Sequence, residues 1–67
     1  MEKVTDNFGS MICMADAATG QVEERYRDLT MCVAIQIGDS FTLSRGNKVT
    51  VVTRTPEGFA AVSVMAA

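Results

Sequence analysis

LTMCVAIQI, the stretch at residues 29–37, decides the fold class, because its large apolar side chains alternate with smaller or polar ones. A repeat of two residues is typical of a β-strand, in which successive side chains point to opposite faces of the sheet. A helix over the same residues would scatter the large side chains around its axis, and β-branched residues favour the extended form. The sequence therefore predicts a strand here, within an all-β fold.

The residues that follow predict a hairpin. Phe41 and Leu43 restart the alternation after a break at Gly38-Asp39. Arg45-Gly46-Asn47 then forms a turn, because glycine and asparagine tolerate positive φ. Residues 48–55 alternate again, and they are expected to pair with the short strand before the turn.

A second turn leads into the last predicted strand. In Thr55-Pro56-Glu57-Gly58, proline fixes φ at the second position and glycine suits the fourth. Residues 59–65 are expected to return as a strand, and neither of its faces is polar.

The amino-terminal half allows two interpretations. Residues 10–15 are apolar, and Asp16-Ala17-Ala18-Thr19-Gly20 is typical of a hairpin loop in which the carboxylate accepts from later amides. Residues 21–27 are then the returning strand. The alternative is one short helix over Gln21–Asp28, since Glu23 and Arg27 stand at i and i+4 and both are good helix formers.

The length restricts the chain to a single small domain over residues 1–67. Short strands joined by tight turns predict a five- to six-stranded antiparallel barrel or rolled sheet, whose closure would remove exposed edges. The carboxyl-terminal half, with Gly38-Asp39, Arg45-Gly46-Asn47 and the Pro56-Glu57-Gly58 turn, resembles many SH3-like small barrels. A flexible amino-terminal segment over residues 1–9 is one expectation. A chain of this size buries only about 60% of its unfolded surface, so help from a partner is plausible.

Composition argues against several functions. Six basic residues against eight acidic ones give a net charge of −2, and the basic residues are scattered, which argues against nucleic-acid binding. With no histidine and only two cysteines, the chain cannot assemble a zinc site, so no metal or other cofactor is expected. There is no signal sequence and no apolar run long enough to span a membrane, so we expect a complete small acidic protein of the cytoplasm.

The inventory for catalysis is poor. General acid–base and nucleophilic catalysis most often rely on histidine, which is absent. The carboxylates of Asp16, Asp39 and Glu57 lie in predicted turns, and the adjacent Glu23 and Glu24 would point to opposite faces of a strand. We therefore expect a protein that is not an enzyme.

The two cysteines lie in apolar runs. Free cysteine in such a setting behaves as a small buried hydrophobe, which is the expectation for both Cys13 and Cys32. A disulfide is the alternative if their strands are neighbours, although a reducing compartment opposes it.

Two groups of residues are candidates for binding. Alternate arginines on a strand can hold carboxylate or phosphate and tyrosine is favoured at interfaces, so Arg25, Tyr26 and Arg27 are candidates for a partner site. Three runs of the chain carry no charge, although a small barrel buries only one face of each strand. Their second faces are candidates for self-association: Thr30, Cys32, Ala34, Gln36, Ala60, Val62 and Val64.

The turn at residues 55–60 resembles a turn in the plasmid-encoded type II dihydrofolate reductases, which are small homotetrameric barrels. The likeness covers six residues, TPEGFA, and the Val-Gln-Ile-Tyr tetrapeptide of that family does not follow them. No function is transferred on this likeness.

The sequence thus predicts a small protein-binding module, most simply a homodimer, that acts as an inhibitor or adaptor of a larger protein. Small acidic proteins of phages and mobile elements that block host defence enzymes are the analogy for this expectation. The alternatives are a small oligomeric enzyme or ligand-binding protein with a site between subunits, supplied by Arg25, Tyr26, Arg27 or Gln36, and a structural subunit of a larger assembly.

Overall fold

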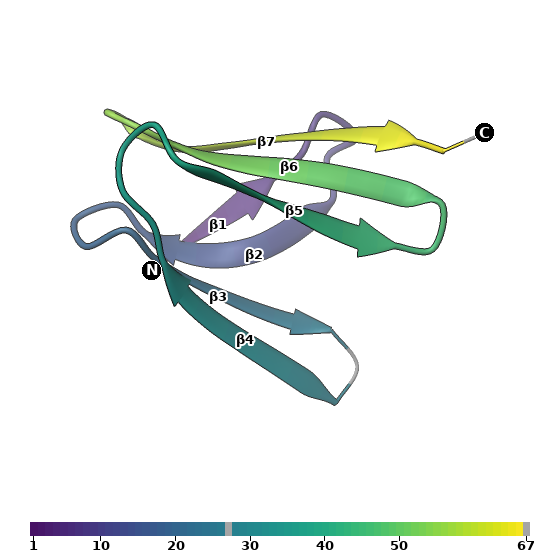
Figure 1. The fold of residues 1–67 in the computed structure, drawn as a ribbon, viewed down its shortest axis with the longest axis horizontal. Coiled ribbons are helices and arrows are strands. Elements are labelled where there is room, and N and C mark those ends of the chain that lie inside the picture. Colours follow the sequence, from purple (N-terminus) through teal and green to yellow (C-terminus); the bar gives the residue numbers. More distant parts are fainter. Residues whose placement is uncertain (27, 67) are drawn as a thin grey trace.

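The computed structural model describes residues 1–26 and 28–66, and these form seven strands and no helix (Figure 1). Sheet A has the order β1-β2-β3-β4 and sheet B the order β5-β6-β7, and neighbouring strands are antiparallel throughout. The strands are β1 (Glu2–Thr5), β2 (Met11–Asp16), β3 (Gln21–Tyr26), β4 (Leu29–Ala34), β5 (Ser40–Arg45), β6 (Lys48–Thr55) and β7 (Gly58–Met65).

The all-β prediction is confirmed, and so is the strand interpretation of the segment after Gly20. β3 lies between β2 and β4, with Val22 fully buried and Glu24 nearly so. The helix alternative is wrong for the described residues, because pairing on both sides of β3 outweighs the local helix preference of glutamate and arginine. Strand β1 was not predicted, so the structure has one strand more than the largest number expected.

The strand predicted at residues 29–37 ends early, at Ala34. The Ile35 N–H donates to the Gly20 carbonyl (3.0 Å), and the Ile35 carbonyl accepts from Arg54 Nη1 (2.9 Å). The Asp39 N–H then donates to the Gln36 carbonyl (2.9 Å) and turns the chain toward β5. Gln36 and Ile37 are therefore not part of a strand, because the preceding carbonyl, that of Ile35, is hydrogen-bonded to the Arg54 side chain and not to a neighbouring strand.

The predicted turns are confirmed. Asp16 Oδ1 accepts from the Ala18 N–H (2.9 Å), the Asp16 carbonyl accepts from the Gly20 N–H (2.8 Å), and Gly20 has φ +80°. The later hairpins close where Arg45 pairs with Lys48 and where Thr55 pairs with Gly58.

The core lies between the two sheets, which meet along one side only. Its buried apolar residues are Val4, Ile12, Cys13, Ala15, Val22, Val52 and Ala61. β1 and β2 contact β7, whereas β4 and β5 diverge from their connection and, among the described residues, make no contact with each other (Figure 1). The sheets therefore form an open arrangement without a closed barrel in the described part of the chain, and the SH3-like barrel stays a prediction.

Candidate binding surfaces

The outer face of sheet B carries no charged side chain. It consists of alternate residues of the three strands, and we call it the valine face: Ser40, Thr42, Ser44, Val49, Val51, Thr53, Ala60, Val62 and Val64. Val51 pairs with Val62 and Val49 with Val64, so the valines of β6 and β7 are cross-strand neighbours. Val51, Val62 and Val64 are 41%, 57% and 60% exposed. An exposed apolar group of this kind typically marks an interaction surface.

Sequence reasoning found only part of this face. It selected Ala60, Val62 and Val64, all of which are exposed in the structure. Val49 and Val51 were not selected, although the alternation of residues 48–55 had placed them on one face. The missing information was the pairing of β6 with β7, which brings the two sets of valines together.

The free edge of sheet A is a second uncharged surface. β4 is the last strand of the sheet, with Thr30, Cys32 and Ala34 exposed on one face and Met31 and Val33 half-buried on the other. Natural proteins usually protect an edge strand with charges, proline or a β-bulge. β4 contains no proline and no charge, and its register with β3 is uninterrupted, so the strand is open to further pairing.

The predicted self-association residues therefore occupy two surfaces rather than one. Thr30, Cys32 and Ala34 lie on sheet A, and Gln36 is exposed in the turn after it. Ala60, Val62 and Val64 lie on sheet B. Cys32 was expected to be buried, and this is wrong because β4 is an edge strand whose second face has no covering layer. Cys13 is buried as expected, and both thiols are free.

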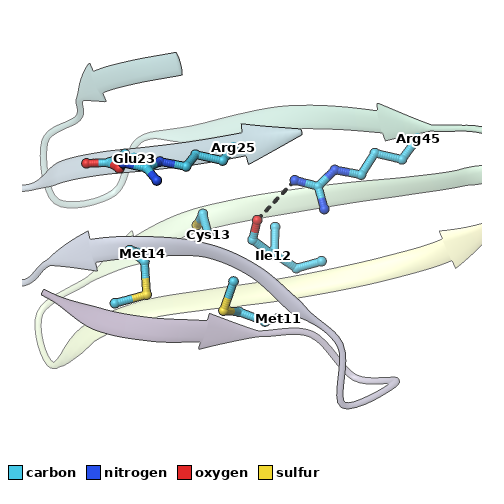
Figure 2. A pocket seen from close by; sticks show the side chains of 7 residues that line it. All are labelled: Met11, Ile12, Cys13, Met14, Glu23, Arg25 and Arg45. Carbon is cyan, nitrogen blue, oxygen red and sulfur yellow. Dashed lines mark hydrogen bonds and ion pairs between the residues drawn. The ribbon is translucent and has the colours of Figure 1, made fainter. Parts of the chain in front are cut away.

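A pocket opens where β2 and β3 separate. Their pairing stops at Met14 and Glu23, although β2 continues back along β1 and β3 continues along β4. Arg45 reaches from β5 into this fork, where its Nη2 donates to the Ile12 carbonyl (3.1 Å; Figure 2). The same Nη2 also donates to the Glu24 carboxylate.

The fork pocket has a volume of about 190 Å³. Its walls are apolar on the β2 side and carry ion-paired groups on the other: Met11, Ile12, Cys13, Met14, Glu23, Arg25 and Arg45. Figure 2 shows Met11 and Met14 on one side of the recess, with Glu23 and Arg25 across from them. Because Arg25 pairs with Glu23 (3.1 Å) and Arg45 pairs with Glu24, the pocket suits a small apolar group better than a charged one.

The thiol in this pocket is a weak nucleophile. Burial raises the pKa of Cys13 to about 11, and the Glu24 carboxylate adds to the rise while Arg45 partly offsets it. The thiol therefore stays protonated at neutral pH.

We expect iodoacetamide to label Cys32 and leave Cys13 unmodified in the native protein, as measured by peptide mass spectrometry. A pKa of about 11 against the ordinary 9.0 leaves about a hundredfold less thiolate at Cys13, and burial slows access further. In denaturant both sites should react. Equal labelling of the two cysteines in the folded protein would contradict this account of the pocket.

Of the predicted partner site, the structure describes mainly Arg25. Its side chain is 77% exposed and its charge is balanced by Glu23 on the same strand. Tyr26 pairs with Leu29 at the end of the β3–β4 hairpin. The Tyr26 side chain and the whole of Arg27 lie outside the described part of the chain. The described residues thus show a solvated ion pair at this place.

A buried polar network, which sequence reasoning missed, joins the first turn to sheet B. Asp6 Oδ1 accepts from the N–H groups of Phe8 (3.0 Å) and Ser10 (2.9 Å). Asp6 Oδ2 accepts from Ser63 Oγ (2.5 Å) and pairs with Lys48 Nζ (2.5 Å). Burial alone would raise the pKa of Asp6, but Lys48, Ser63 and the two amides hold it well below its usual range.

The same network fixes the outer edge of β7. Asn7 accepts from the Ser63 N–H at Oδ1 (2.6 Å), and its Nδ2 donates to the Ser63 carbonyl (3.2 Å). Ser63 Oγ also lies 2.6 Å from Thr50 Oγ1. Ser63 is 2% exposed and the Asp6 side chain is fully buried, so these groups hold the fold together and are inaccessible to a substrate.

Comparison with known proteins gives no significant match to a family model, to a curated protein or to a solved structure. Within the described residues, no cluster of three or more His, Cys, Asp or Glu side chains could hold a metal ion, and no helix could cross a membrane.

Proposed function

We propose that this chain is a non-enzymatic protein-binding module of the cytoplasm. It self-associates and acts by stoichiometric contact, as an inhibitor or adaptor of a larger protein. The observation that carries the proposal is the valine face, where Val51, Val62 and Val64 stay 41–60% exposed on neighbouring strands of one sheet.

The composition of the face determines what can cover it. A charged partner side chain pressed against it would lose water and meet no opposite charge, which is unfavourable. Hydroxyl groups are present only on β5 and at Thr53, beside the valines of β6 and β7. We therefore assign this face to an uncharged, apolar surface of the larger protein, such as the flat face of a sheet.

Val62→Lys should abolish this contact while leaving the fold intact. Val62 is 57% exposed, so the substitution should change stability by only about 0.5 kcal/mol. In a buried interface the unpaired lysine should weaken binding about tenfold or more. The measurement is affinity capture on the immobilised chain, followed by titration of the recovered protein.

Ala18→Lys is the matched control, because it adds the same charge at an exposed turn position that is not part of the valine face. The proposal expects a partner that the wild type and Ala18→Lys bind one to one and that Val62→Lys loses. A partner retained by Val62→Lys would refute the assignment to the valine face. Recovery of no protein above background by the wild type would refute protein binding as the function.

A further inference from the structure

The edges of the two sheets are not equally protected. β1 has only four residues and carries Glu2 and Lys3, and Asn7 occupies the backbone of β7 at Ser63. β5 ends in Arg45, whose side chain crosses toward β2. β4 has no comparable protection, since its six residues are uncharged and unbulged.

The backbone groups at this edge follow from the pairing with β3. The Ile35 N–H donates to the Gly20 carbonyl, one step beyond the pair of Ala34 with Gln21. Hydrogen-bonded and non-hydrogen-bonded pairs alternate along an antiparallel ladder. Met31 and Val33 therefore direct their N–H and C=O groups toward β3, and Thr30, Cys32 and Ala34 direct theirs away from it, toward the open edge.

A second β4 strand is complementary to this edge in one register above all others. A twofold axis perpendicular to the sheet places residues of the same face opposite each other in the two copies. Successive residues of a strand alternate between the faces, so only every second register is compatible with this axis. With Cys32 on the axis, Thr30 lies opposite Ala34 of the second copy, and all three outward-facing residues of each strand enter bonded pairs. Shifting the strands by one allowed step leaves one outward-facing residue in each strand without a partner.

The side chains agree with this register. On the inner face Met31 would lie opposite Val33 of the second copy, so both half-buried side chains gain an apolar neighbour. On the outer face the residues are threonine, cysteine and alanine. No charge is buried anywhere along the contact, because the strand has none.

We propose that β4 pairs antiparallel with β4 of a second copy of this chain, with Cys32 on the twofold axis, to make one continuous sheet. This rests on the self-association included in the proposed function and specifies where it occurs. The valine face is left uncovered in this dimer and stays available to the larger protein.

Cys32→Pro tests the edge, read by light scattering after gel filtration over a concentration series. Proline removes an N–H that β3 does not use, and edge positions of this kind tolerate it. The dimer dissociation constant should rise about tenfold or more, because the central bonded pair is lost. If Cys32→Pro does not fold, judged by circular dichroism, the double variant Thr30→Lys/Cys32→Lys places edge lysines at exposed positions instead.

Cys32→Ser is the matched control and should remain dimeric, as should Val62→Lys. A wild type that is monomeric at every concentration would overturn the proposal, and so would a dimer that the edge variants leave intact. A dimer lost in Val62→Lys but kept in Cys32→Pro would assign self-association to the valine face and refute the β4 contact. None of these three results would by itself remove binding of a larger protein.

Crosslinking tests the register. A bonded antiparallel pair has Cα atoms about 5.5 Å apart, within the range of a disulfide. Diamide, which takes up the two thiol hydrogens as the S–S bond forms, should therefore convert the native dimer to a covalent dimer through Cys32, and Cys32→Ser should give none. A non-covalent dimer that diamide fails to crosslink would overturn the register with Cys32 on the axis.

Discussion

Gly20→Ala is expected to destabilise the protein by about 3 kcal/mol or more, which is enough to unfold most of the molecules of a domain this small. Gly20 has φ +80°, which L side chains rarely adopt. A Cβ atom there would also collide with the Ile35 carbonyl oxygen and with the Arg54 guanidinium. The carbonyl is backbone and is held in place, because the Ile35 N–H donates to Gly20 itself.

The collision falls on the junction between the two sheets. Arg54 of β6 donates to the Ile35 carbonyl (2.9 Å) and to the Ala17 carbonyl (3.1 Å). It therefore ties sheet B to the β2–β3 turn and to the end of β4. A methyl group at Gly20 would displace the guanidinium and release both contacts, so its effect should extend beyond the turn.

Gly9→Ala is the matched control for Gly20→Ala. Gly9 has φ +81°, almost the same as Gly20, but a Cβ there would meet no atom within 4 Å. Gly9→Ala should therefore be destabilised only by the strain of a positive φ at alanine, which is about 1 to 2 kcal/mol. Urea unfolding followed by circular dichroism measures both variants, and an equal loss in the two would show that the contact with Ile35 and Arg54 is unimportant.

Asp6→Asn is expected to lower the melting temperature by about 10 °C or more, as breaking a buried charge network does in a small domain. The amide keeps the shape of the carboxylate but carries no charge for Lys48. An NH₂ group only donates, so it cannot replace Asp6 Oδ2, which accepts from Ser63 and pairs with Lys48. Asp16→Asn is the control, because the Asp16 carboxylate accepts one exposed turn hydrogen bond, from Ala18.

The pH dependence of this effect has a definite sign. The pKa of Asp6 in the folded protein lies below its ordinary value of 3.8, so the unfolded chain binds the proton more tightly. The stabilisation is complete above 3.8 and is lost as pH falls through that value toward the folded-state pKa. The stability difference between wild type and Asp6→Asn should therefore be largest near pH 7 and smaller at pH 3. A difference that grows on acidification would contradict the ion pair.

The parts of the fold that depend on neighbouring residues were predictable from sequence. The alternation in β4, β5 and β6 and the turn residues Asp16, Gly20, Gly46 and Pro56 act within a few positions of each other. The features that were missed depend on contacts between distant residues. Ser63 meets Asp6 and Asn7 across 57 and 56 positions, and Arg54 ends the β4 ladder from 19 positions away.

The candidate surfaces show the same division. The lack of charge along residues 29–37 and 58–65 is visible in the sequence, and so is the exposure of the second face of each strand. Strand order is not visible, and it makes β4 an edge and places Val51 beside Val62. The exposure of Cys32 and the pairing of Arg45 with Glu24 depend on how far the sheets diverge, which no local pattern encodes.

The most direct test of the account is the solution mass of the wild-type chain, measured by light scattering from about micromolar to millimolar concentration, the range in which small interfaces associate. We expect the mass to rise with concentration from 7.2 kDa to twice that value, as two uncharged β4 edges pair. A mass that stays at 7.2 kDa over the whole range would contradict it, because the exposed edge would then have no affinity for its own copy.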